Sequence, residues 1–297
     1  MRPANAAGLF VAVLFSQDFT LRSDTNLVLL DVAVLGPGGA PVSGVSQDRF
    51  LVWEDGKPQQ IKFFSVAEAP VSMGFVLDMS GSMAKSLQGV NRAVRALLKA
   101  SNPEDEFFVT GFNDSVRLGL PAGMPFSKNV TAVQNAVQSF RPAGRTSLYD
   151  GLVLSFQHVE KSHFERRVLV LISDGKDTAS SASFTGVLQY ARTTPVTVYT
   201  VALTEEGDTD SRLGILKQIA NVTGGRYFKP VDLQDLETVC MTIARDVRAR
   251  YSLAYTPPAS KSAVRKIKVE IKRELNAPKR SVRTRTEYSL EKPPSGG

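Results

Sequence analysis

The sequence is poor in the two residue types that build most zinc and redox sites. Its 297 residues include one cysteine, Cys240, and two histidines, His158 and His163. A single cysteine excludes an intrachain disulfide and a thiolate metal cluster. The histidines are not at i, i+4 spacing and no third histidine exists, so a zinc site is not expected. A glycine-rich phosphate loop ending in Lys-Ser/Thr is also missing, which removes the usual signature of a P-loop nucleotide site.

Long apolar runs are missing as well. No run reaches the roughly 20 residues of a transmembrane helix. Residues 1–16 combine Arg2, a short apolar core at 6–15 and Ser16, which resembles a brief secretory signal. The segment lacks a clear A-x-A cleavage pattern and equally fits a buried N-terminal strand or helix turn. With a signal, the protein is exported to the periplasm, the cell surface or the medium; without one, it is cytoplasmic.

Positive charge is concentrated near the C-terminus. The formal net charge is +7, and residues 245–285 hold thirteen Lys or Arg against Asp246, Glu270 and Glu274. In 266–272 charged and apolar residues alternate, as in a half-buried strand with a solvated outer face. Aromatic stacking residues do not interleave with these charges, so nucleic acid is not expected as a partner.

The middle of the chain, residues 71–248, alternates apolar runs with longer amphipathic patterns. Such an alternation predicts an α/β fold with a doubly wound, mainly parallel sheet covered by helices on both faces. The predicted strands are 73–77, 107–112, 168–172, 196–202 and 227–228, and the predicted helices are 84–100, 129–140, 148–161, 183–193, 211–222 and 233–247.

Both flanks of this region consist of short strand patterns separated by Gly, Pro and Asp turns. The N-terminal β segment is 24–70, with strands at 27–35, 50–52 and 61–64, and the C-terminal one is 249–290, with strands at 251–255, 265–273 and 281–288. Each is too short to bury a core alone, so we predict that they pair into one small β-sandwich with the α/β region inserted between them. Residues 1–23 are expected to be a signal peptide or disordered, and 291–297 a disordered tail.

Three loops place oxygen ligands at ends of the predicted strands. Asp78, Ser80 and Ser82 follow the run that ends at Leu77, Thr146 lies in Gly-Arg-Thr-Ser, and Asp174 lies in Ser-Asp-Gly. Each motif alone fits a helix cap or a turn. Together they favour a shared site, because the carboxyl ends of parallel strands meet at one edge of a sheet. Oxygen donors without His or Cys suit a hard cation such as Mg²⁺.

These three motifs, in this order, resemble the metal-ion-dependent adhesion site of the von Willebrand factor type A family. The resemblance covers residues 71–248, and the flanking phrases 50–59 and 251–257 are similar to a group of bacterial proteins related to that family, many of them exported. It implies a Rossmann-like fold and an ion, Mg²⁺ or alternatively Mn²⁺ or Ca²⁺, held by Asp78, Ser80, Ser82, Thr146 and Asp174. It further implies that an Asp or Glu carboxylate of a protein partner completes the coordination, and that the last helix, 233–247, moves when the site changes.

The residues favour a non-catalytic adhesion module over the alternative, a phosphoesterase-like hydrolase that uses the same ion. The position two residues after Asp78 is Ser80 rather than a second aspartate that acts as a general acid, and the histidines belong to a helix pattern. Asp114 and Asp177, in loops near the same edge, are either supports of the site or turn formers. The sequence does not indicate an oligomeric state.

Overall fold

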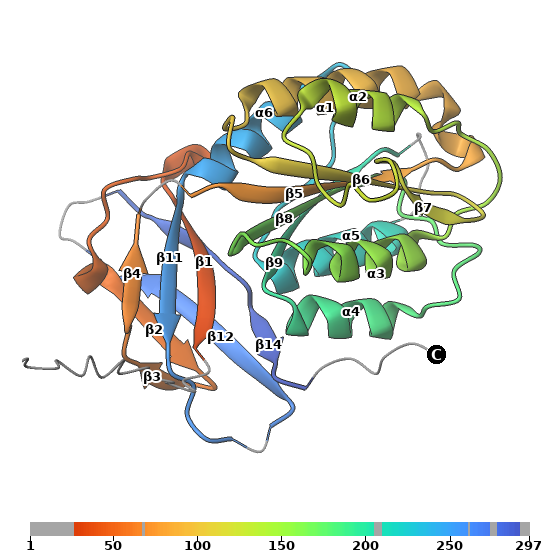
Figure 1. Cartoon of the computed structure of the whole chain (residues 1–297). Coiled ribbons are helices and arrows are strands. Elements are labelled where there is room, and N and C mark those ends of the chain that lie inside the picture. Colours follow the sequence, from red (N-terminus) through yellow and green to blue (C-terminus); the bar gives the residue numbers. More distant parts are fainter. Residues whose placement is uncertain (1–26, 67–68, 205–209, 261, 274–277, 292–297) are drawn as a thin grey trace, which may run out of the picture.

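The centre of the molecule is a mostly parallel six-stranded sheet (Figure 1). The computed structural model describes residues 27–66, 69–204, 210–260, 262–273 and 278–291. The strand order is β10-β9-β8-β5-β6-β7, and each neighbouring pair is parallel except β6 with β7. The strands are β5 (Val71–Asp78), β6 (Glu106–Phe112), β7 (Val116–Leu118), β8 (Arg166–Ser173), β9 (Val196–Ala202) and β10 (Tyr227–Phe228).

Helices cover both faces of this sheet. One face carries α1 (Leu87–Ala100), α2 (Val130–Gln138) and α6 (Asp235–Arg248), and the other carries α3 (Leu148–Val159), α4 (Phe184–Thr193) and α5 (Asp210–Thr223) (Figure 1). All eight residues of β5 are buried, as expected for a central strand covered on both sides. The predicted doubly wound, mainly parallel sheet is therefore confirmed. The antiparallel edge strand β7 was not predicted.

Beside the α/β region, the described part of the chain forms two four-stranded antiparallel sheets. Their strand orders are β13-β1-β11-β4 and β14-β12-β2-β3. Each sheet combines strands from before and after the α/β region, and one apolar core lies between them, including Leu30, Phe50, Tyr251 and Val269. The predicted sandwich with an inserted α/β region is present. The strands are β1 (Val28–Leu35), β2 (Phe50–Glu54), β3 (Lys57–Gln59), β4 (Phe63–Ser65), β11 (Arg250–Tyr255), β12 (Val264–Ile271), β13 (Ser281–Arg283) and β14 (Glu287–Ser289).

The run at 281–288, predicted as one strand, forms two strands in different sheets. β13 pairs with β1, whereas β14 pairs with β12. The residues between them dock on the α/β region: the Thr286 amide donates to the Val222 carbonyl at 3.2 Å, and Arg285 Nη2 donates to the Ala191 carbonyl at 3.0 Å. These distant contacts break the strand, and a local pattern does not reveal them.

A buried polar network joins the sandwich to the α/β region where α6 runs into β11. Tyr199 donates its hydroxyl to Asp246 at 2.8 Å and accepts from Arg250 Nη2 at 2.9 Å. Arg283 of β13 donates to the same Asp246 carboxylate at 2.8 Å. Burial raises the pKa of the Tyr199 hydroxyl, so it keeps the proton that it donates.

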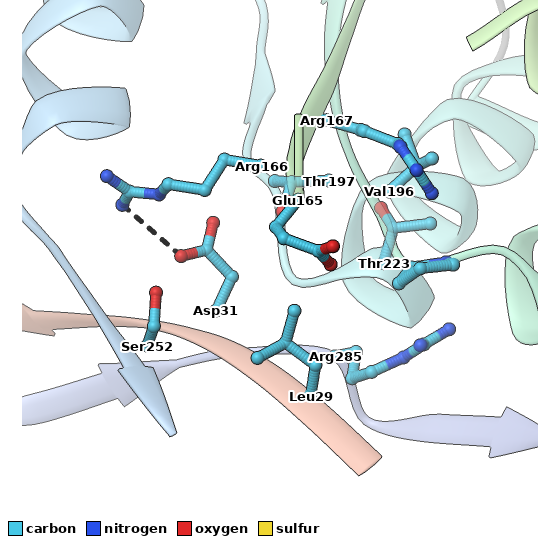
Figure 2. Close-up of a pocket in the computed structure, with 11 residues that line it drawn as sticks. Leu29, Asp31, Glu165, Arg166, Arg167, Val196, Thr197, Thr223, Ser252 and Arg285 are labelled. Carbon is cyan, nitrogen blue, oxygen red and sulfur yellow. Dashed lines mark hydrogen bonds and ion pairs between the residues drawn. The ribbon is translucent and has the colours of Figure 1, made fainter. Parts of the chain in front are cut away.

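A small cavity lies at the same junction, with Asp31, Arg166, Thr197 and Arg285 among its lining residues (Figure 2). Its volume is about 30 Å³. Because a water molecule needs about 10–15 Å³ by this measure, the cavity has room for about two waters.

The candidate signal segment at 1–23 and residues 292–297 of the predicted tail lie outside the described residues. Among the residues that are described, no helix has the length and apolar character needed to cross a membrane.

Candidate metal centre

The loop after β5 turns back on itself and fixes the direction of the Asp78 carboxylate. The Ser80 amide donates to Asp78 Oδ1 at 2.9 Å, and the Met79 amide donates to the Phe112 carbonyl of β6 at 2.8 Å. A 3₁₀ turn, Gly81–Lys85, follows Ser80, so the helix predicted to start at residue 84 starts at Leu87 instead. Asp78 and Ser80 are each 2% exposed, so the carboxylate and the first hydroxyl lie beneath the surface.

Side chains of the first and third loops meet at the carboxyl edge of the sheet. Ser82 Oγ donates to Asp174 Oδ2 at 2.9 Å, and the hydroxyls of Ser80 and Ser82 lie 3.1 Å apart. The cause is the topology: β5 and β8 are adjacent and parallel, so the residues that follow them emerge together. This edge is a topological switch point, because β6 lies on one side of β5 and β8 lies on the other.

The second loop lies against the first. The Ala143 amide donates to the Met79 carbonyl at 2.9 Å, and the Gly81 amide donates to the Gly144 carbonyl at 3.1 Å. Thr146 is 4% exposed, and its carbonyl accepts from the Thr178 amide at 2.8 Å. The structure thus brings the loops of all five predicted ligands to one edge, four of them through side-chain hydrogen bonds and Thr146 through its backbone.

The electrostatics of the edge favour a bound cation. Burial raises the pKa of the Asp78 carboxyl, and the nearby Asp174 carboxylate raises it further, whereas hydrogen bonds from Ser173 and Ser80 lower it. The ammonium of Lys176, 3.1 Å from Asp174 Oδ2, is the positive group paired with this carboxylate. Two buried carboxylates beside neutral hydroxyls form an all-oxygen donor set with surplus negative charge. This set fits a hard divalent cation such as Mg²⁺.

Ser173 and Lys176 are site residues that the sequence did not reveal. Ser173 Oγ donates to Asp78 Oδ2 at 2.7 Å and accepts from the Gly175 amide at 3.0 Å. It thereby connects the ends of β5 and β8 and orients the first carboxylate. In the sequence, the position of Ser173 directly before Asp174 was the one indication of its role. Only the pairing of β5 with β8 shows that the side chains of Ser173 and Asp78 meet.

The other loop aspartates have partners outside the ligand set. Arg145 Nε donates to Asp114 Oδ1 at 3.0 Å, and this hydrogen bond lowers the pKa of the Asp114 carboxyl. Asp177 Oδ1 accepts from Ser180 Oγ at 2.5 Å and from the Tyr149 amide at 3.3 Å. These contacts give both residues the role of loop anchors.

The histidine of α3 lies away from this edge. His158 Nε2 is 2.7 Å from the Pro125 carbonyl, and its ring packs between Phe108 and Phe126. Burial lowers its pKa, which keeps the imidazole neutral. Within the part of the chain that the structure describes, no group of three or more His, Cys, Asp or Glu side chains is placed to hold a metal. The candidate is the edge where the carboxylates of Asp78 and Asp174 lie with the hydroxyls of Ser80 and Ser82, with Thr146 on the adjoining loop.

A doubly wound sheet with oxygen side chains gathered at its switch point defines the class of Rossmann-like ligand-binding domains. The family model of the von Willebrand factor type A domain matches residues 73–241, more than half of the chain. The chain belongs to this family. No curated protein matches the sequence.

Solved structures share the fold at low sequence identity. A von Willebrand factor type A protein from Catenulispora acidiphila superposes with a TM-score of 0.54 and 12% identity, covering 89% of this chain and 73% of that one. The PilB minor pilin from Streptococcus sanguinis gives a TM-score of 0.50 and 12% identity, covering 62% of each chain. The first match extends beyond the α/β region, so the likeness includes part of the flanking sheets.

Proposed function

We propose that this protein is a non-catalytic, Mg²⁺-dependent protein-binding module of the adhesion type. Asp78, Ser80, Ser82, Thr146 and Asp174 hold the ion, and an Asp or Glu carboxylate of a partner protein completes its coordination. The observation that carries the proposal is the contact of Ser82 Oγ with Asp174 Oδ2 at 2.9 Å, because it joins two loops that are 92 residues apart. Mn²⁺ and Ca²⁺ are the alternative ions for the same oxygen donors.

The composition of the ligand set explains why an outside carboxylate is required. When bound, the ion supplies a positive charge that attracts an anion. Three of the five ligands are neutral hydroxyls, and Lys176 already pairs with one of the two carboxylates, so part of that charge stays uncompensated. Ser173 holds one carboxylate in place, and the backbone bonds between the Met79 and Ala143 loops hold the hydroxyls near it. Because the ligands are already held in place, little conformational entropy is lost when the ion binds. The charge-assisted contact between the ion and the partner carboxylate then contributes most of the binding free energy.

Family membership supports the interaction role, and the likeness to a minor pilin agrees with a place at the cell surface. The signal-like pattern at 1–16 points the same way. We therefore propose that the protein is exported and that its partner is another envelope or extracellular protein.

The test combines metal titration with partner capture. Calorimetry should detect one Mg²⁺ site in the purified protein and none in Asp78→Ala, with circular dichroism showing that the variant is folded. Immobilised protein should retain envelope proteins of the source cells in Mg²⁺ and release them in EDTA. Glu104→Ala is the matched control, since it removes an exposed carboxylate before β6 that pairs with Lys128 outside the ligand set.

Binding that persists in EDTA, or in folded Asp78→Ala, would falsify the proposal. The hydrolase alternative predicts turnover of a phosphoester panel that disappears in Asp174→Ala. Such turnover would replace the adhesion role with a catalytic one.

A further inference from the structure

A groove of about 300 Å³ opens beside the candidate metal residues and shares Ser82 and Asp174 with them. Its other walls come from the 3₁₀ turn before α1, the residues after β9 and the loop between β10 and α6. A volume of this size is at the lower end of ligand sites and suits one or two side chains rather than a cofactor.

One wall of the groove is apolar and is formed by Leu203, Val231 and Leu233. Leu203 and Leu233 pack partly against the main core, whereas Val231 is 94% exposed. Val231 is the most exposed large hydrophobic residue among those that the structure describes. An exposed apolar side chain at the rim of a groove is typical of an interaction surface, because burying it against a partner is favourable.

The loop that carries Val231 is held by side chains at the start of α6. The Val231 amide donates to Asp235 Oδ2 at 3.3 Å, and the Gln234 amide donates to Asp232 Oδ1 at 2.8 Å. These bonds hold the backbone of the loop at Val231, which lowers the cost of ordering the loop when a partner covers it.

The charges of the groove select an acidic partner when the ion is present. Its charged lining residues are Lys85, Lys176, Asp174 and Asp232, two of each sign. Asp174 and Lys176 pair with each other, so Asp78 balances only one of the two charges of a divalent ion at the adjacent site, and one positive charge remains. An anionic group therefore goes to the ion, and the apolar wall is left for the residue beside that group.

We propose that this groove is the specificity pocket of the module: it takes an apolar side chain adjacent to the acidic residue that completes the ion. The proposal rests on the proposed function. Consecutive Cα atoms of a peptide are about 3.8 Å apart, and the groove shares two residues with the metal site, so one short segment reaches both. The partner is a segment in which Asp or Glu has an aliphatic neighbour.

The experiment is an NMR titration of the ¹⁵N-labelled full chain in saturating Mg²⁺ with three capped peptides. The first, Gly-Leu-Glu-Leu-Gly, has leucine on both sides of the acid. Gly-Ser-Glu-Ser-Gly removes the leucines, and Gly-Leu-Gln-Leu-Gly removes the acid. We expect the Leu-Glu-Leu peptide to bind about tenfold more tightly than Ser-Glu-Ser, as partial burial of a leucine side chain allows. The Leu-Gln-Leu peptide should not bind.

Two valine variants separate the groove from general surface effects. Val231→Ser should reduce the tenfold preference to about twofold or less. Val66→Ser replaces another exposed valine, 53% exposed and outside the groove, and should leave the preference unchanged.

The outcomes distinguish the two proposals. Equal, Mg²⁺-dependent binding of both Glu peptides would overturn the groove and leave the metal-dependent function standing. A preference for Leu-Glu-Leu that survives in Val231→Ser would also overturn it. Binding of neither Glu peptide in Mg²⁺ would overturn the groove proposal, whereas the calorimetry and partner capture described above test the metal-dependent function separately.

Discussion

Burying the charged Asp78 carboxylate lowers the stability of the metal-free fold, and a bound ion would offset this loss. The carboxylate is 2% exposed and has Asp174 as a neighbour of the same charge. Two hydrogen bonds, from Ser173 Oγ and the Ser80 amide, compensate only part of the desolvation, since the pKa remains raised. Buried charges of this kind persist when function requires them, even where a neutral residue would be more stable.

Asp78→Asn should therefore stabilise the metal-free protein and abolish its response to Mg²⁺. The folded-state pKa of Asp78 lies above the unfolded value, so its stabilising contribution is present only at acidic pH and is lost as the pH rises through the folded pKa. At pH 7 in EDTA, we expect the variant to gain on the order of 1 kcal/mol, or roughly 2–4 °C in Tm. Differential scanning fluorimetry with and without 10 mM Mg²⁺ measures both effects.

The wild type should gain stability in Mg²⁺ by linkage, and the control Glu104→Gln, an exposed carboxylate outside the ligand set, should gain as much. An Asp78→Asn protein that still gains stability in Mg²⁺ would remove Asp78 from the ligand set. A variant less stable than the wild type in EDTA would show that the hydrogen bonds outweigh the desolvation.

At the scale of elements, the sequence predicts what depends on local periodicity. The parallel strands and the amphipathic helices each have a pattern with period 2 or 3.6 or a continuous apolar run, and these were predicted. β7 is three residues long and lacks such a pattern. The split between β13 and β14 depends on docking against α4 and α5, which is tertiary information.

The same reasoning applies to the site. Asp78 and Asp174 were predictable because each ends or follows a strand, and the carboxyl ends of parallel strands converge. Ser173 and Lys176 were not, because the first acts through the pairing of β5 with β8 and the second through the path of its own loop. Site residues that act through a neighbour need the three-dimensional structure.

The docked segment between β13 and β14 makes Gly224 sensitive to a single methyl group. Gly224 has φ +76, and a Cβ there would lie 2.3 Å from the backbone nitrogen of Arg285. Gly224→Ala should therefore destabilise the protein by about 2 kcal/mol or more, from the left-handed conformation and the backbone clash. Urea unfolding measures the change.

Gly214→Ala is the matched control with the opposite sign. Gly214 lies within α5, and nothing lies within 4 Å of the position of its Cβ. Alanine there should stabilise the protein by about 0.5–1 kcal/mol. Two alanine variants with equal stability would contradict the docking of the segment against Gly224.

At the scale of the whole molecule, one buried carboxylate connects the two regions. Asp246 of α6 accepts from Tyr199 of β9 and from Arg283 of β13, and it lies 3.6 Å from Arg250 of β11. Its side chain is 4% exposed, so water does not replace these partners. The orientation of the sandwich on the α/β region therefore depends on the charge of Asp246.

Asp246→Ala should cost about 3–5 kcal/mol, because it leaves buried arginine charge without this partner. The control is Glu237→Ala, which breaks the surface pair with Arg92, where both side chains are about half exposed. The control should cost less than about 1 kcal/mol. Denaturant unfolding of both variants tests this, and a similar cost for both would show that the junction network does not hold the regions together.

Division of the chain tests the insertion directly. The fragment 71–248 retains the central sheet with its helices and the main core, so it should fold and show helical circular dichroism. Residues 27–66 keep only the β2–β3 hairpin, because β1 pairs with β11 and β13 and β4 pairs with β11.

This N-terminal piece also loses the partners of a buried acid. Glu54 accepts hydrogen bonds from the hydroxyls of Tyr255 at 2.6 Å and Tyr288 at 2.8 Å and from Arg265 at 3.0 Å. All three donors come from the C-terminal segment, so the isolated piece cannot bury Glu54 without leaving its charge unpaired. We expect residues 27–66 alone to be unfolded by NMR. A folded, monomeric N-terminal piece beside a folded 71–248 fragment would contradict a sandwich that both ends of the chain must complete.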